Sequence, residues 1–148
     1  MTEFFIRLFA MLPLSGAQAA GSLLGRLAWH LNGRERKTAE VNIRLCFPEL
    51  QEREQQELVR ETLRENGKLI TELPKSWLAS REYWQKRLEG QAFTDEIRRL
   101  LEQGRGVIIA APHLGNWEVG LHTITAAGPT TVLYRPPRQS WLSSLMDQ

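Results

Sequence analysis

The chain has 148 residues, of which 42% are hydrophobic and 24% are charged, and its formal net charge at pH 7 is +2. These values suit one globular domain and exclude a largely disordered or fibrous protein, and so small a net charge argues against nucleic acid as the main partner. Cys46 is the only cysteine, which excludes an intramolecular disulfide and a metal site built from several cysteines.

Residues 8–25 form an uncharged N-terminal segment bracketed by Arg7 and Arg26. The segment approaches the length of a bilayer span, but Pro13 and several glycines and polar residues make it a poor spanning helix. We therefore expect a helix that lies on a membrane surface. Two alternatives stay open: an ordinary buried helix, and a secretory signal, because residues 17–19 (Ala-Gln-Ala) have the form of a cleavage site.

A group of basic residues follows this segment: Arg34, Arg36, Lys37 and Arg44. Basic side chains beside an apolar segment are suited to anionic lipid headgroups. The same residues are equally suited to the solvated face of a helix.

Residues 50–73 have the pattern of a long helix, with apolar positions spaced among i,i+4 charge pairs. Pro74 is expected to end this helix. Trp77 and Trp84 follow in the stretch SWLASREYWQKRL. Aromatic residues at helical spacing pack in a core or line an apolar groove that faces lipid, and both interpretations stay open.

The C-terminal part predicts a β-α-β unit. Residues 106–112, GVIIAAP, have the β-branched pattern of a buried strand, residues 116–128 that of a helix ending at Gly128, and residues 130–135, TTVLYR, that of a second strand. The expected fold class is therefore α/β, with a helical N-terminal arm followed by a parallel-type sheet core. Because the chain stops at the start of a further element, we expect it to be truncated.

His113 follows the first predicted strand, at the edge where open parallel sheets place their active sites. On one continuous helix, Glu118 would point about 140° away from His113, so the two side chains can meet only if His113 lies in a loop. Gly115 allows such a turn, and Asn116 is suited to cap the next helix. Glu118 could then orient the His113 ring as a general base.

Two other interpretations of these residues stay open. His113 could simply bond a backbone carbonyl. Alternatively, Glu118 and His122, at i,i+4 spacing, could bind a metal together with His113 in a metal-dependent hydrolase. The strong helical zinc signature, H-E-x-x-H, is absent, which disfavours the hydrolase.

Three separated motifs carry a family resemblance: VNIRLCFPEL at 41–50, APHLGNWE at 111–118 and YRP at 134–136. In this order they resemble the lipid A biosynthesis acyltransferases, the lauroyl and myristoyl transferases related to the glycerolipid H-x4-D/E acyltransferases. The resemblance implies a glycerolipid acyltransferase-like core, incomplete at its C-terminus. Residues 1–33 would be a membrane-associating helix, and residues 34–148 the N-terminal part of the acyltransferase domain.

The resemblance also implies roles for individual residues. His113 is similar to the general base of the family and Glu118 to its carboxylate partner, while Gly115 and Asn116 belong to the same turn and would help to bind substrate. Arg135 is similar to a position near the active-site cleft, where it would meet a phosphate or the thioester side of the donor.

The implied reaction transfers a fatty acyl chain from acyl carrier protein to a hydroxyl of a lipid A precursor, without a metal or other cofactor. The implied location is the cytoplasmic face of the inner membrane. Since members of the family are longer than this chain, a non-catalytic, membrane-associated fragment is a further alternative.

Overall fold

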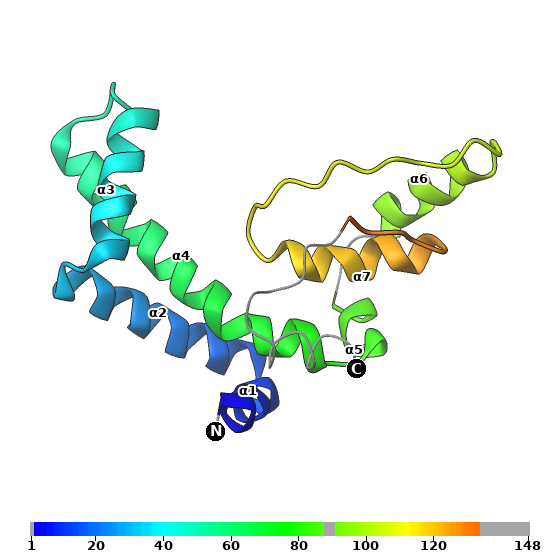
Figure 1. Cartoon of the computed structure of the whole chain (residues 1–148), viewed down its shortest axis with the longest axis horizontal. Helices are drawn as coiled ribbons and strands as arrows, with labels where there is room; N and C mark the ends of the chain where they lie inside the picture. The colour runs from blue at the N-terminus through cyan, green and yellow to red at the C-terminus, as the bar shows by residue number, and fades with distance from the viewer. Residues whose placement is uncertain (1, 88–90, 134–148) are drawn as a thin grey trace. The chain divides into compact units, whose positions relative to one another are not determined.

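The computed structural model describes residues 2–87 and 91–133, and in these residues it contains seven α-helices and no β-strand (Figure 1). The helices are α1 (Thr2–Met11), α2 (Leu14–Leu31), α3 (Arg34–Cys46), α4 (Glu52–Leu78), α5 (Arg81–Gln85), α6 (Gln91–Leu101) and α7 (Trp117–Ala127). The chain divides into two compact units, one of Ile6–Lys75 and one of Met1–Phe5 with Ser76–Gln148. None of the described helices combines the length and the apolar character that a membrane span needs.

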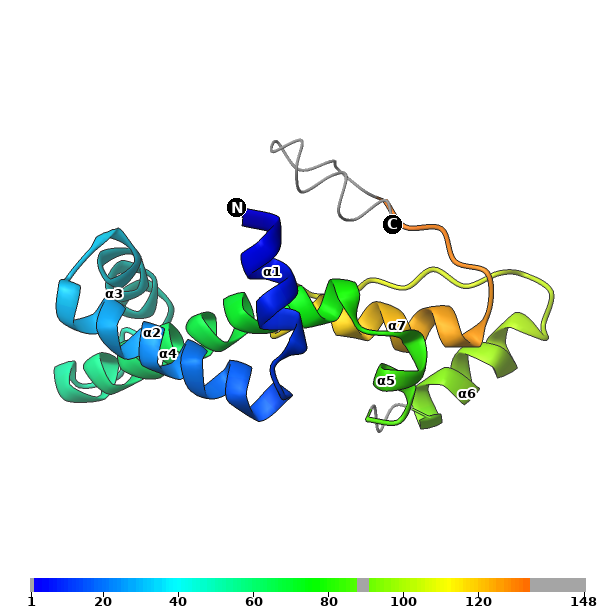
Figure 2. The same ribbon diagram turned by 90° about the horizontal axis from the view of Figure 1, so that it is seen from below.

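In the unit Ile6–Lys75, α2 lies against α4 through glycines (Figure 1 and Figure 2). A Cβ atom built on Gly67 of α4 would lie 2.1 Å from the carbonyl oxygen of Gly21, and one built on Gly25 would lie 2.3 Å from the carbonyl oxygen of Leu63. The Thr71 hydroxyl donates a hydrogen bond of 2.8 Å to the carbonyl of Ala17 across the same contact. The two backbones are therefore too close for any side chain larger than hydrogen at these glycines.

The core of this unit lies between α3 and α4. It is made by Ala39 and Ile43 of α3 with Val59 and Leu63 of α4. Trp29 of α2 packs against this core, and two guanidinium groups lie over its ring, those of Arg36 at 3.8 Å and Arg60 at 4.5 Å from the ring centroid. The apolar periodicity of α3 and α4 thus decides which faces of these helices meet.

Helix α4 is supported locally at its start. The backbone N–H of Gln51 donates to the Glu54 carboxylate at 2.8 Å, one half of a capping box.

The prediction that Pro74 ends the helix is wrong, because α4 continues to Leu78. Proline removes one backbone hydrogen bond, but Pro74 is itself buried, and packing of the last turn holds the helix beyond it.

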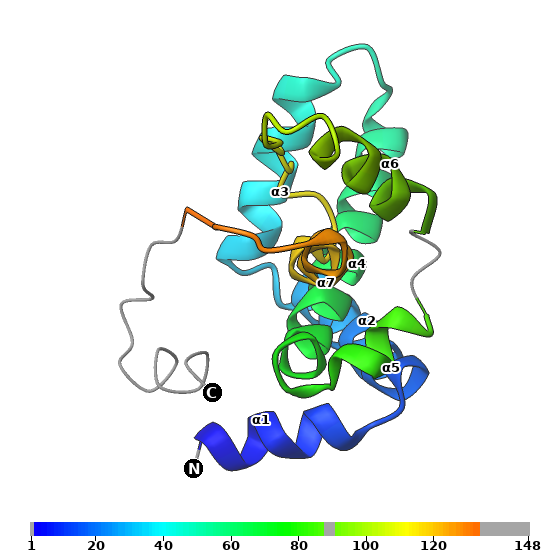
Figure 3. The same cartoon turned by 90° about the vertical axis from the view of Figure 1, so that its right-hand side faces the viewer.

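In the other unit, α6 and α7 lie side by side, as Figure 3 shows in a view along α7. Trp84 of α5 and Ile97 of α6 are buried. Arg98 of α6 donates to the carbonyl of Ala126 at 3.0 Å, and Arg81 at the start of α5 donates to the carbonyl of Thr125 at 2.9 Å. The last turn of α7 is thus bonded to the two helices that precede it.

The predicted α/β fold is contradicted, since the described residues hold helices alone. The βαβ unit required strands at 106–112 and 130–135; residues 106–112 and 130–133 have no regular secondary structure, and residues 134 and 135 lie outside the described part of the chain. Ile108 and Leu133 are fully exposed, at 100% and 102%. An apolar, β-branched run becomes a strand only when neighbouring strands bond its backbone groups, and none does so in the described residues. The helix between these runs is present as α7.

Candidate active site

The segment that carries His113 runs from the end of α6 to the start of α7 without regular structure (Figure 1). Gly115 has a φ of 59°, in the left-handed region that glycine enters without steric cost. Asn116 follows at the N-cap position of α7, although its side chain does not cap the helix. His113 therefore lies in a loop and Glu118 in the first helical turn.

Glu118 is half-buried and accepts a hydrogen bond from the indole Nε1 of Trp77, in the last turn of α4. Burial raises the pKa of the Glu118 carboxyl, because a charged form is poorly solvated there, and the Trp77 hydrogen bond opposes this rise in pKa. The pKa of the Glu118 carboxyl therefore depends on both its burial and its hydrogen bond with Trp77.

His113 is exposed, and its ring packs against that of Trp117, with 4.9 Å between the ring centroids and 50° between the planes. No hydrogen bond joins His113 to Glu118 in the part of the chain that the structure describes. The two residues are brought into neighbouring turns but are not paired. The catalytic dyad therefore stays a prediction.

Ser76 binds α7 at two points. Its hydroxyl accepts a hydrogen bond of 2.8 Å from the side-chain amide of Asn116, and its carbonyl oxygen lies 3.2 Å from Nε2 of His122. Because a carbonyl can only accept, Nε2 of His122 must carry the proton. The His122 ring also stacks on Trp84, with 5.9 Å between centroids.

These contacts give no support to the metal-dependent hydrolase. Nε2 of His122 is already bound to a carbonyl. Among residues 2–87 and 91–133, no group of three or more histidine, cysteine, aspartate or glutamate side chains is arranged to hold a metal ion. Arg135 and the YRP motif at 134–136 lie outside the described residues.

The sequence did not point to Ser76 and Trp77 as parts of this site. Trp77 lies 41 positions from Glu118, and its helical spacing indicated only a core or a groove. No motif links the end of α4 to the start of α7. A carboxylate and an indole N–H that both become half-buried do need partners, and this is the only signal that could have suggested the pair.

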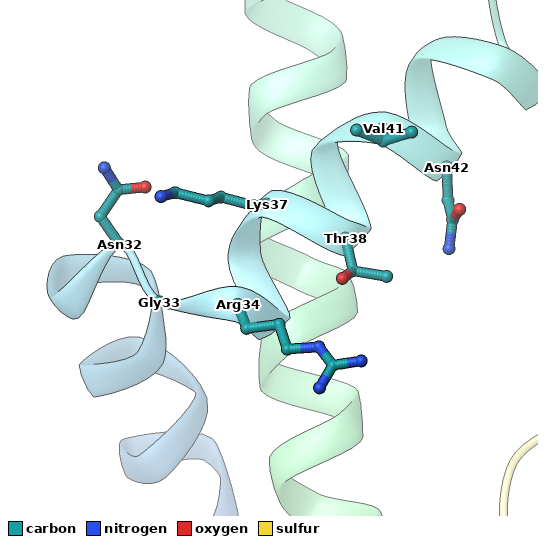
Figure 4. A pocket seen from close by; sticks show the side chains of 7 residues that line it. All are labelled: Asn32, Gly33, Arg34, Lys37, Thr38, Val41 and Asn42. Carbon is teal, nitrogen blue, oxygen red and sulfur yellow. The ribbon is translucent and has the colours of Figure 1, made fainter.

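A pocket of about 470 Å³ lies in the unit Ile6–Lys75, at the turn between α2 and α3 (Figure 4). It is lined by Asn32, Gly33, Arg34, Lys37, Thr38, Val41 and Asn42. Arg34 and Lys37, from the predicted basic group, are exposed here. Arg36 is instead paired with Glu40 at 2.8 Å, so the basic residues are only partly available to an external anion.

Comparison with known proteins shows the relationships of the chain. The family model described as bacterial lipid A biosynthesis acyltransferase matches residues 1–146. The chain is 26% identical to the lipid A biosynthesis palmitoleoyltransferase of Escherichia coli K12, over 87% of the chain and 42% of that protein. It is 27% identical to the lipid A biosynthesis lauroyltransferase of the same organism, over 93% of the chain and 45% of that protein.

A lipid A biosynthesis acyltransferase of Haemophilus influenzae is 30% identical over 90% of the chain and 43% of its own length. The chain thus spans less than half the length of these relatives. No solved structure matches the chain significantly.

Proposed function

Because the chain belongs to the bacterial lipid A biosynthesis acyltransferase family, we propose that it carries the acyl-transfer residues of an enzyme that acylates a lipid A precursor. The acyl donor is acyl carrier protein, whose thioester is already activated, so no metal or other cofactor is needed. The observation that carries this proposal is the family match over residues 1–146, which includes the H-x4-E turn. Relatives named as lauroyl and palmitoleoyl transferases support a fatty acyl chain as the transferred group.

His113 acts as the general base in this proposal. It takes the proton of the acceptor hydroxyl while that oxygen attacks the thioester carbonyl. The C–S bond then breaks as the ester C–O bond forms, and the imidazolium returns the proton to the departing thiolate. The exposure of His113 in a loop supports this role, because a lipid hydroxyl can reach the ring.

Glu118 orients and stabilises the His113 ring once the ring is charged. Gly115 and Asn116 shape the turn between the two residues, and the exposed backbone of this turn is available to the substrate. Arg135, from the YRP motif, is assigned to a phosphate or to the thioester side of the donor by resemblance alone.

The test is acyl transfer from acyl carrier protein by purified protein that carries its complete natural sequence. The variant His113→Ala is expected to lose at least about 100-fold in kcat, the usual scale for removal of a general base. His30→Ala, which removes an exposed histidine of α2, is the matched control and should keep normal turnover. Normal turnover in His113→Ala would contradict the general-base role.

We also propose that α2 lies on the cytoplasmic face of the inner membrane. Its buried face is made of Ala17, Gly21 and Gly25, while Leu23, Leu27 and Leu31 recur every four residues on another face and are 66%, 51% and 69% exposed. A stripe of exposed leucines is costly in water and favourable at a lipid surface.

Basic side chains of the same unit would meet anionic headgroups at this surface. Arg34 and Lys37 are exposed around the pocket at the start of α3. Sedimentation of the chain with anionic vesicles tests the location. Leu27→Glu should reduce binding, whereas Leu45→Glu, at an exposed leucine of α3, should not. Equal binding by both variants would contradict the assignment of α2.

A further inference from the structure

Hydrogen bonds join the last turn of α4 to Asn116 and to α7. Trp77 donates its indole N–H to Glu118, Ser76 accepts from Asn116 at 2.8 Å, and the Ser76 carbonyl lies 3.2 Å from Nε2 of His122. All five residues belong to one compact unit. The residue types also fit, because each contact pairs a donor with an acceptor.

The Trp77 contact leaves half of the carboxylate available. The indole binds Oε2 of Glu118, and no described side chain donates to Oε1. A carboxylate has about four acceptor positions, so Oε1 can still accept from a ring nitrogen. With one oxygen held, the carboxylate no longer rotates freely, and the direction of its second oxygen is set before substrate binds.

We propose that Trp77 is a positioning residue for acyl transfer: its indole N–H orients the Glu118 carboxylate towards the His113 ring, while Ser76 holds the turn between them through Asn116. This inference rests on the proposed function of His113 and Glu118. Trp77 touches neither substrate nor reacting atoms and acts only through Glu118.

Within residues 2–87 and 91–133, no charged side chain binds the Glu118 carboxylate. In the described part of the chain, Arg81 and Arg98 reach α7 from the helices packed against it, and both bind carbonyls in its last turn, those of Thr125 and Ala126. His122 lies one turn after Glu118, but its Nε2 is bound to the Ser76 carbonyl. The hydrogen bond that acts on the Glu118 carboxyl therefore comes from Trp77.

Trp84 provides a matched control. It is buried, with 4% of its surface exposed, and its Nε1 has no hydrogen-bond partner in the described residues. Trp84→Phe thus removes an indole N–H that orients nothing, whereas Trp77→Phe removes the one that holds Glu118. Both variants make the same change, from a bicyclic indole to the smaller phenyl ring.

The first experiment needs no turnover. In ¹⁵N–¹H spectra of the chain, the Trp77 indole signal, assigned by its absence in Trp77→Phe, should shift as pH titrates Glu118 and should stop shifting in Glu118→Gln. The Trp84 signal should not respond. A Trp77 signal that is unaffected by Glu118→Gln would overturn the contact.

The second experiment uses acyl transfer by protein with its complete natural sequence. Trp77→Phe should lower kcat by about 10- to 100-fold, as misplaced catalytic groups do, with little change in KM. The acidic limb of its kcat/KM profile should move to higher pH, because the pKa of Glu118 rises when the hydrogen bond is lost. Trp84→Phe should keep the parental pH profile.

The outcomes separate the two proposals. Normal turnover in His113→Ala refutes the proposed function itself. If His113→Ala is inactive but the pH profile of Trp77→Phe matches that of Trp84→Phe, the positioning role is refuted and the general base stands. If Trp77→Phe fails to fold, benzothienylalanine at position 77 replaces it, because sulfur takes the place of the N–H and the shape of the side chain is kept. Its kcat and its pH profile are then compared with those of Trp84→Phe in the same way.

Discussion

The close contact between α2 and α4 predicts that Gly67→Ala will destabilise the unit Ile6–Lys75. The new Cβ would lie 2.1 Å from the Gly21 carbonyl oxygen and 3.0 Å from the backbone nitrogen of Gly25, and backbone atoms of a helix cannot move aside as a side-chain end can. The two helices must therefore separate locally, which costs about 1–3 kcal/mol by analogy with overpacked cores.

Two smaller effects act in opposite directions. Separation of the helices would break the 2.8 Å hydrogen bond from Thr71 to the Ala17 carbonyl, worth about 1 kcal/mol. Alanine in place of glycine inside α4 gains about 1 kcal/mol of helix propensity. Because these two effects nearly cancel, the free energy of unfolding should fall by about 1–3 kcal/mol, which is about 5- to 150-fold in the folding equilibrium.

Chemical denaturation followed by far-UV circular dichroism measures this loss. Gly16→Ala in α2 is the matched control, since the one described atom that its Cβ would meet is a side-chain atom of Pro13 at an ordinary 3.7 Å. This control should be as stable as the parent or slightly more so. If Gly67→Ala were also as stable as the parent, the close approach of the two helices would be refuted.

Three further predictions concern single residues. Burial raises the pKa of Glu118 above its usual value of 4.5, so the contribution of this carboxyl to stability is complete below pH 4.5 and is lost as the pH rises through the folded-state pKa. The free energy of unfolding of Glu118→Gln, measured by denaturation at several pH values, should therefore increase relative to that of the parent as the pH rises. A difference that stays constant with pH would contradict the raised pKa. Gly115→Ala should cost about 1–2 kcal/mol through its left-handed φ, since no atom of the described residues lies within 4 Å of the new Cβ, and Gly115→Asn should cost less in the same assay. Thr71→Val should lower the unfolding free energy by about 1 kcal/mol and Thr71→Ser by less, because serine keeps the hydroxyl; equal losses would mean that the hydrogen bond to Ala17 is not the cause.

The helices and the family could be predicted from the sequence because the signals for both are local or linear. The charge pairs of residues 50–73 predict a helix that the structure confirms as part of α4, and Asn116 and Gly128 mark the two ends of α7. Helical hydrogen bonds join residues four positions apart, so spacing alone carries this information. The three motifs likewise needed only their order in the chain, and the family match confirms the resemblance.

The predicted strands failed for the opposite reason. A run such as residues 106–112 is apolar and β-branched in any context, but a strand exists only when other strands bond its edges, and in the described residues it has no such neighbours. The prediction also relied on that sheet to place His113. The loop position of His113 instead follows from Gly115 and from the start of α7.

Tertiary structure alone decided which distant residues meet. The glycine contact of α2 with α4 and the bond from Trp77 to Glu118 join positions far apart in the chain, and no periodicity relates them. Packing selects such pairs because a half-buried carboxylate or indole must find a partner among whatever side chains the folded helices bring near. The sequence by itself thus determined the helices and the family, whereas folding determined the partner of Glu118.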